Sequence, residues 1–256
     1  MEKLKITFLG TGTSQGVPVI GCQCDVCKSS SKFDKRLRSS ILVEQGKTSF
    51  TIDAGPDFRY QMLRQGVRDL DAILITHCHK DHIAGLDDVR AFNFLLKKPM
   101  KVYATTRDQK AIKTEFSYAF GENRYPGVPN FELLELDTKP FKVKDIEVIP
   151  LKALHKTMEV TGFRIDDFAY ITDTHYIPPE TLVEISDCKI VVISSVRRTP
   201  HPSHYSLDEA VKILEFLRPE KAFITHVSHL MGKHDEVNKE LPDFISLAFD
   251  GLVLEM

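Results

Sequence analysis

Short apolar runs, each bounded by turn-forming or charged residues, recur along this chain of 256 residues. Runs of about four to eight apolar and β-branched residues are typical of strands, because a helix needs a longer pattern. We therefore expect β-strands at 4–9, 40–44, 49–52, 72–75, 101–104, 145–150, 161–165, 169–172, 190–194 and 222–225.

Helical patterns lie between these strands, at 58–63, 87–96 and 107–120. The clearest helix begins at Ser206, where Glu209 three residues later completes a capping box. Apolar residues at helical spacing follow, and Pro219 ends the element. Strands and helices mix without the strict alternation of a doubly wound sheet. This order predicts an α/β sandwich of two mixed sheets with helices on both outer faces.

No linker, repeat or low-complexity tract divides the chain, so we expect one domain over residues 1–256. The turn-rich segment 121–130 is the one long insertion. It is interpreted either as a surface loop or as a lid over a functional site, since mobile loops often carry function.

An apolar content of 42%, a charged content of 27% and a net charge of −2 are those of an ordinary globular protein. The slightly acidic balance disfavours nucleic-acid binding without excluding it. No apolar run approaches the ~20 residues that span a bilayer. Charges at Glu2, Lys3 and Lys5 are unlike a signal peptide. We expect a cytoplasmic protein with no membrane partner. The sequence leaves open whether the protein forms a homodimer.

The most informative segment is Thr76–His82, which directly follows an apolar run and reads Thr-His-Cys-His-Lys-Asp-His. His77 and His79 project to the same side, because side chains alternate along a strand. Asp81 and His82 follow where the chain turns, so they can serve a second ion beside the first. Imidazole and carboxylate ligands suit zinc, manganese or iron rather than calcium or magnesium. The segment therefore predicts ligands for two adjacent metal ions.

Three later residues of ligand type, His155, Asp173 and His226, each end an apolar run. Strand ends at one sheet edge converge, so these side chains can complete a pair of metal sites. Asp53 ends another run, and its carboxylate can accept a hydrogen bond from a metal-bound histidine. The alternative for Asp53 is a turn-forming role before Gly55.

Cys22, Cys24 and Cys27 form a cluster of a different kind. In a reducing compartment this spacing is typical of metal binding rather than of disulfides. Thiolates favour zinc, and a closed structural site needs a fourth ligand. The candidates for that ligand are His229 and His234.

Together with residues 8–14 and 172–174, the Thr76–His82 segment resembles the metallo-β-lactamase superfamily, over essentially the whole chain. The three cysteines, with the His-Val-Ser-His run at 226–229, resemble a narrower group within it. That group is the phosphoribosyl cyclic phosphate phosphodiesterases of bacterial phosphonate degradation.

The resemblance implies an αβ/βα sandwich that holds two manganese or zinc ions between its sheet edges. It implies this division of ligands: His77, His79 and His155 for the first ion, Asp81, His82 and His226 for the second, and Asp173 bridging both. It also implies one structural zinc at a Cys₃His site completed by His229, on a loop near 21–28. Two ions ~3.5–4 Å apart can activate a shared water and clamp the oxygens of a displacement.

The same resemblance assigns His204 as the catalytic histidine beside the leaving group, acting with Asp81 and Asp173. A positioned proton donor typically contributes ~10²–10⁴-fold to such a reaction. His201, between two prolines, is a nearby alternative, and His175 is interpreted as structural or as part of the rim.

We therefore interpret the chain as a binuclear metal-dependent phosphodiesterase that attacks a small phosphodiester with a metal-bridged hydroxide, and a cyclic sugar phosphate is one candidate substrate. Three alternatives stay open: a tRNA 3′-end endonuclease, a hydrolase of carboxylic esters, thioesters or lactams, and a non-catalytic metal-binding module. The lack of a long arm and the net charge of −2 favour a small substrate.

Overall fold

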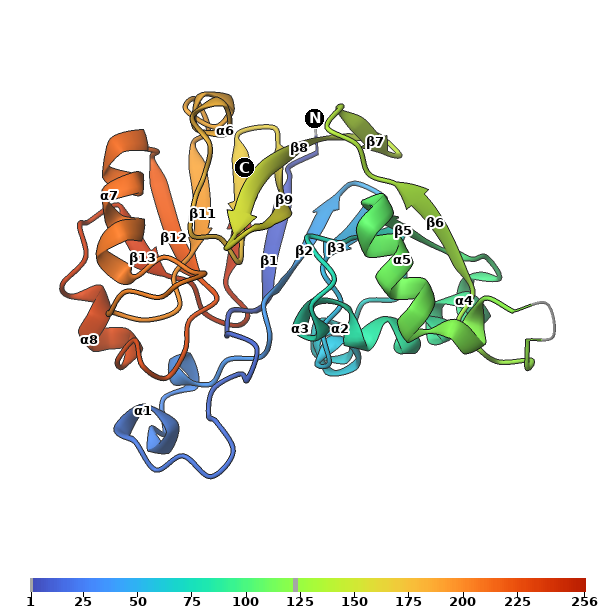
Figure 1. Ribbon diagram of the computed structural model, residues 1–256, viewed down its shortest axis with the longest axis horizontal. Coiled ribbons are helices and arrows are strands. Elements are labelled where there is room, and N and C mark those ends of the chain that lie inside the picture. Colours follow the sequence, from blue (N-terminus) through green and yellow to red (C-terminus); the bar gives the residue numbers. More distant parts are fainter. Residues whose placement is uncertain (1, 122–123) are drawn as a thin grey trace.

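Two seven-stranded sheets face one another in the computed structural model of this protein, which describes residues 2–121 and 124–256 (Figure 1). The first sheet, in the order β14-β1-β2-β3-β4-β5-β6, contains β1 (Lys5–Gly10), β2 (Ser40–Gln45), β3 (Thr48–Ile52), β4 (Ala72–Leu74), β5 (Met100–Ala104), β6 (Phe131–Glu135) and β14 (Val253–Glu255). The second, in the order β13-β12-β11-β10-β9-β8-β7, contains β7 (Phe141–Val143), β8 (Ile146–His155), β9 (Met158–Ile165), β10 (Phe168–Ile171), β11 (Ile190–Ser194), β12 (Lys221–Thr225) and β13 (Ile245–Leu247).

Helices cover the outer face of each sheet, as the sequence predicts. The first sheet carries α2 (Phe58–Gln65), α4 (Arg90–Leu96) and α5 (Thr106–Glu115). The second carries α6 (Pro179–Glu184), α7 (Leu207–Leu217) and α8 (His234–Asn238). Two shorter helices lie in loops, α1 (Asp25–Lys28) after β1 and α3 (Lys80–Ile83) after β4, and 3₁₀ turns span Lys32–Asp34, Ala84–Val89 and Ser117–Ala119.

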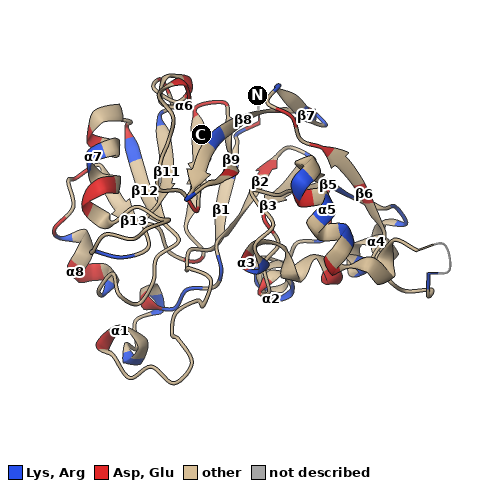
Figure 2. Ribbon diagram, in the orientation of Figure 1, with Lys and Arg blue, Asp and Glu red and all other residues tan. Residues whose placement is uncertain are grey.

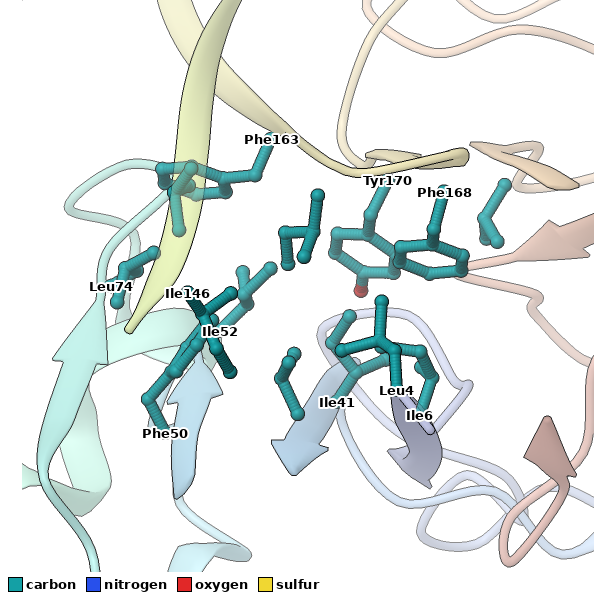
Figure 3. Packing of buried hydrophobic residues seen from close by; sticks show 14 of the residues in the cluster. Leu4, Ile6, Ile41, Phe50, Ile52, Leu74, Ile146, Phe163, Phe168 and Tyr170 are labelled. Atoms are coloured by element: carbon teal, nitrogen blue, oxygen red, sulfur yellow. The ribbon is translucent and has the colours of Figure 1, made fainter. Parts of the chain in front are cut away.

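The central strands β4, β10 and β11 are apolar on both faces because the middle of each sheet is covered on both sides. In β10, Phe168 and Tyr170 pack between the sheets, while Ala169 and Ile171 pack beneath the helices. Figure 3 shows Phe168 and Tyr170 lying over Ile41 and its neighbours from the first sheet. This arrangement explains why the strand patterns are continuous apolar runs rather than alternating ones.

Strand direction brings the chemically active residues to one edge of the sandwich. β3 to β6 run parallel to one another, and so do β10 to β13. Asp53 and the Thr76–His82 segment follow the carboxyl ends of β3 and β4. Asp173 and His226 follow the carboxyl ends of β10 and β12 in the opposite sheet.

The predicted elements are present, with differences that have physical causes. Strand β8 continues past Pro150 to His155, whereas the sequence pattern predicts a strand that ends at residue 150. Strand β7 pairs only with the start of β8, so Pro150 lies where β8 has a free edge and its missing N–H breaks no ladder. The helix predicted at 107–120 ends at Glu115, and a 3₁₀ turn follows it. The capping box of Ser206 and Glu209 is confirmed.

The insertion 121–130 lies partly outside the described residues, which omit 122 and 123. Its described end leads into β6, where the Asn130 N–H donates to Asn93 Oδ1 over 2.9 Å. Because β6 runs parallel to β4, its start lies at the sheet edge opposite Thr76–His82. That position favours the surface-loop interpretation over the lid.

Among the described helices, none combines the length and the apolarity that crossing a membrane requires.

The hydroxyl of Tyr170 gives a direct test of the core. It is fully buried and has no hydrogen-bond partner among the described residues. An unpaired buried hydroxyl costs about 1–3 kcal/mol, so Tyr170→Phe should raise the free energy of unfolding by about 1 kcal/mol. Chemical denaturation measures this change. Phe168→Ala, which empties a neighbouring position, should instead lower stability by about 3–5 kcal/mol. A clear loss of stability in Tyr170→Phe would contradict the unpaired state.

Candidate metal centre

Three residues near the space between the sheets have an unusual backbone conformation. Asp53, Asp173 and His226 have φ angles of 66°, 55° and 59°, in the left-handed region that non-glycine residues rarely adopt. Asp53 and His226 directly follow β3 and β12, and Asp173 lies two residues after the end of β10. Such local strain costs free energy and collects at functional sites. The strand ends are therefore shaped for the side chains that they present.

Three histidines gather on one side of the centre. The ring centroids of His77 and His79 are 4.6 Å apart, and His155 lies 5.8 Å from the first and 5.2 Å from the second. His77 and His79 come from the first sheet, whereas His155 ends β8 in the second. The structure thus brings together the three residues predicted for one ion.

Asp81, His82, Asp173 and His226 gather on the other side, with their ligand atoms within 4.8 Å of one another. The two carboxylate oxygens of Asp173 face different histidines. Oδ2 lies 3.1 Å from His82 Nε2, and Oδ1 lies 3.1 Å from His226 Nε2. Asp81 Oδ2 lies 3.2 Å from His82 Nε2. The four residues predicted around a second ion therefore converge as well.

In two of these histidines, a hydrogen bond at Nδ1 determines which ring nitrogen faces the centre. Asp53 Oδ2 accepts from His82 Nδ1 at 2.7 Å, as predicted for a carboxylate behind a ligand. The Thr76 hydroxyl donates to the same carboxylate at 2.9 Å, so it accepts from His77 Nδ1 at 3.0 Å. Both rings therefore turn Nε2 toward the centre. Sequence reasoning gave Thr76 no role, because its hydroxyl is recognisable only beside the folded carboxylate.

Electrostatics also fit a cation site. Burial opposes ionisation of Asp173, yet His226 and His82 hold its pKa well below its usual range. Burial opposes protonation of His82, but the neighbouring carboxylates raise its pKa well above its usual value. Nε2 of His77 and Nδ1 of His155 are buried without a hydrogen-bond partner among the described residues. Imidazole lone pairs and ionised carboxylates in a dry site fit divalent cations.

The cysteine cluster is closed by His229. Its Nδ1 lies 3.3 Å from Cys22 Sγ, 3.4 Å from Cys24 Sγ and 3.6 Å from Cys27 Sγ. The Cys27 N–H and the His229 ring lower the pKa of Cys24 to about 6, which favours the thiolate that binds zinc. His234 does not join this cluster.

The ring of His234 is engaged elsewhere. Its Nδ1 lies 3.1 Å from Arg36 Nη2, and its Nε2 lies 2.9 Å from Asn238 Nδ2. Burial and the Arg36 charge lower the pKa of His234 to about 4. The alternative fourth ligand is thus part of a separate buried network.

The three remaining histidines have different neighbours. His204 Nδ1 lies 3.9 Å from Asp173 Oδ1, and its ring centroid is 4.6 Å from that of His155. The His201 ring centroid lies 5.0 Å from that of His204. His175 Nδ1 lies 2.8 Å from the carbonyl of Leu154. Of these three, His204 is the one with described contacts to the ligand groups.

Two mixed sheets with a histidine–aspartate centre at their shared edge define a metal-binding αβ/βα sandwich. A model of the beta-lactamase superfamily domain matches residues 48–227. The chain belongs to the metallo-β-lactamase superfamily, as the sequence resemblance predicts.

Several known proteins are similar to the chain. A solved structure described as a new diphosphatase from the PhnP family is 38% identical, with 99% of this chain and 97% of that one covered and a TM-score of 0.93. An octanoyltransferase of Porphyromonas gingivalis is 37% identical over 253 residues, 97% of this chain and 51% of the relative. A ribonuclease Z of Bacillus cereus is 29% identical over 168 residues, 63% of this chain and 49% of the relative. The chain spans about half the length of these two curated relatives.

The cysteine cluster predicts a defined change in zinc content. Cys24→Ser replaces a soft ligand, so the purified protein should lose one equivalent of zinc and unfold at a lower temperature. Elemental analysis and a thermal scan measure the two effects. Cys188→Ser, at a buried thiol packed under the helices of the second sheet, is the matched control and should keep its zinc. Equal zinc content in both variants would contradict the hypothesis that the cysteine cluster holds a structural zinc ion.

Proposed function

We propose that this protein hydrolyses small phosphodiesters, with a cyclic sugar phosphate as the leading substrate. The observation that carries the proposal is the 38% identity and TM-score of 0.93 to a PhnP-family diphosphatase over nearly the whole of both chains. The convergence of imidazoles and carboxylates around Asp173 supports it.

The proposed centre holds two divalent ions, manganese or zinc. His77, His79 and His155 would hold one, Asp81, His82 and His226 the other, and Asp173 would serve both through its two oxygens. Such a pair of ions supplies a water of lowered pKa and neutralises charge that develops on phosphate oxygens.

Asp173 suits this position because it stays ionised. Its neighbours His226 and His82 hold its pKa low despite burial. Its backbone φ of 55° and the hydrogen bond from Thr172 Oγ1, at 2.9 Å to Oδ2, set the direction of the carboxylate. The chain thus orients this group before any ligand arrives.

His204 is the proposed proton carrier at the leaving oxygen. Burial, with the neighbouring His226, lowers its pKa to about 3, so the ring is neutral at pH 7 in the metal-free protein. Its Nδ1 is buried without a hydrogen-bond partner in the described chain. A neutral imidazole donates one N–H to an oxygen, and an approaching phosphate anion favours the protonated form of the ring.

RNA 3′-end processing is the second candidate, favoured by the similarity to ribonuclease Z. RNA binding relies on basic surfaces that contact phosphates. Here acidic and basic residues are interspersed along α5 and α7 (Figure 2), and the net charge is −2. A third candidate, acyl-ester or thioester hydrolysis, is favoured only by the octanoyltransferase relative. The similarity to the PhnP-family diphosphatase covers 97% of that protein, whereas the chain spans 51% of the octanoyltransferase and the match covers 49% of the ribonuclease Z.

A substrate panel distinguishes these functions. The protein loaded with manganese or zinc is assayed on bis(p-nitrophenyl) phosphate, a ribose cyclic phosphate, a precursor tRNA and an octanoyl thioester. We expect turnover of the small phosphodiesters and its loss in Asp173→Ala. Cleavage of precursor tRNA alone, of the thioester alone, or of none of the four would contradict the proposal.

The role of His204 predicts a dependence on the leaving group. His204→Ala should slow phosphodiesters with poor leaving groups by about 10²–10⁴-fold, because these need a proton on the departing oxygen. Diesters with nitrophenol leaving groups should be affected far less. His201→Ala, which alters the adjacent ring, is the matched control and should show no such dependence. An equal loss across leaving groups in His204→Ala would argue against proton transfer.

A further inference from the structure

The ring of His226 lies between two hydroxyl groups that sequence reasoning did not single out. Ser39 Oγ lies 3.2 Å from His226 Nδ1, and Thr13 Oγ1 lies 3.2 Å from His226 Nε2. Ser39 and Thr13 are both buried, and both belong to the loop that joins β1 to β2. This loop, residues 11–39, also carries the cysteine cluster.

The hydrogen-bond inventory of Ser39 indicates the tautomer of His226. A hydroxyl has one proton to donate. Ser39 donates that proton to the carbonyl of Gly12, at 3.0 Å. With its proton on that carbonyl, the hydroxyl oxygen is free to accept a hydrogen bond from His226 Nδ1. A proton on Nδ1 leaves the Nε2 lone pair on the side of Asp173, where Nε2 lies 3.1 Å from Oδ1.

Backbone contacts hold this arrangement in place. The Val227 N–H donates to the carbonyl of Thr11 at 2.9 Å, and the Thr13 N–H donates to the carbonyl of Val227 at 3.2 Å. These bonds fasten the loop to the residue that follows His226. The hydroxyl of Ser39 thus meets the ring at a fixed separation.

The support for His226 differs from that of its counterpart His82. His82 Nδ1 donates to the ionisable carboxylate of Asp53, whereas His226 Nδ1 has only the neutral hydroxyl of Ser39 in the described chain. An unconstrained imidazole prefers to carry its proton on Nε2, the atom needed here as a ligand. On its Nδ1 side, His226 therefore depends on the hydroxyl of Ser39.

We propose that Ser39 is a positioning residue of the metal centre, which fixes His226 in the tautomer that offers Nε2 to the second ion. The proposal rests on the metal centre of the proposed function, but not on the identity of the substrate. It predicts that removing the hydroxyl weakens binding of one ion while the cysteine cluster keeps its zinc.

The first measurement uses the metal-free protein and needs no turnover. Long-range proton–nitrogen NMR correlations of the His226 ring at alkaline pH report which nitrogen is protonated. The wild type should show protonated Nδ1, and Ser39→Ala should shift the ring toward protonated Nε2. Ser39→Thr, which keeps the hydroxyl, should restore the wild-type spectrum.

The second measurement is metal affinity by titration calorimetry with manganese. Loss of a group that orients a ligand typically lowers metal affinity by about 10–100-fold. Ser39→Ala should therefore weaken the binding of one of the two active-site ions to that extent. Ser40→Ala is the matched control, because Ser40 is equally buried and donates to the carbonyl of Asp53 at 3.0 Å but contacts no imidazole. It should leave the His226 spectrum unchanged.

Two results would overturn the proposal: protonated Nε2 in the wild-type ring, or a Ser39→Ala protein whose ring spectrum and manganese affinity match the wild type. A protein inactive on every phosphodiester that still shows the Ser39-dependent tautomer and affinity would refute the proposed function and support this inference.

Discussion

The structure depends on an unfavourable concentration of lone pairs and negative charge at the junction of the two sheets. His77, His82 and Asp173 are almost completely buried, with ring nitrogens and carboxylate oxygens turned toward each other. Buried polar groups without partners cost free energy. Divalent ions convert that cost into coordination, and their binding free energy then contributes to folding. Because the ligands come from both sheets, the same ions would join the two halves of the sandwich.

The end of β12 connects this centre to the cysteine cluster. His226 faces Asp173, and His229, three residues later, faces the three cysteines. The loop of residues 11–39 supplies the cysteines and also the hydroxyls that contact His226. A zinc ion among the cysteines would therefore hold the loop that supports an active-site ligand. One segment of chain therefore contacts both clusters.

Much of the fold and of the candidate site could be predicted from the sequence, because local patterns indicate both. The buried strands appear as continuous apolar runs, and the ligands follow them in positions that parallel strands bring together. The residues that orient ligands could not all be predicted. Ser39, Thr13 and Thr76 are ordinary small polar residues, and each matters only through a partner distant in the sequence. Likewise β8 could not be extended past Pro150, because the free edge that tolerates proline arises from the shortness of β7.

The central claim is that ligands from both sheets hold two ions on either side of Asp173. Anomalous difference maps from crystals grown with zinc, recorded above and below the zinc absorption edge, test it most directly. We expect two peaks flanking the Asp173 carboxylate and a third among Cys22, Cys24, Cys27 and His229. A peak at the cysteines with a single peak, or none, beside Asp173 would contradict it.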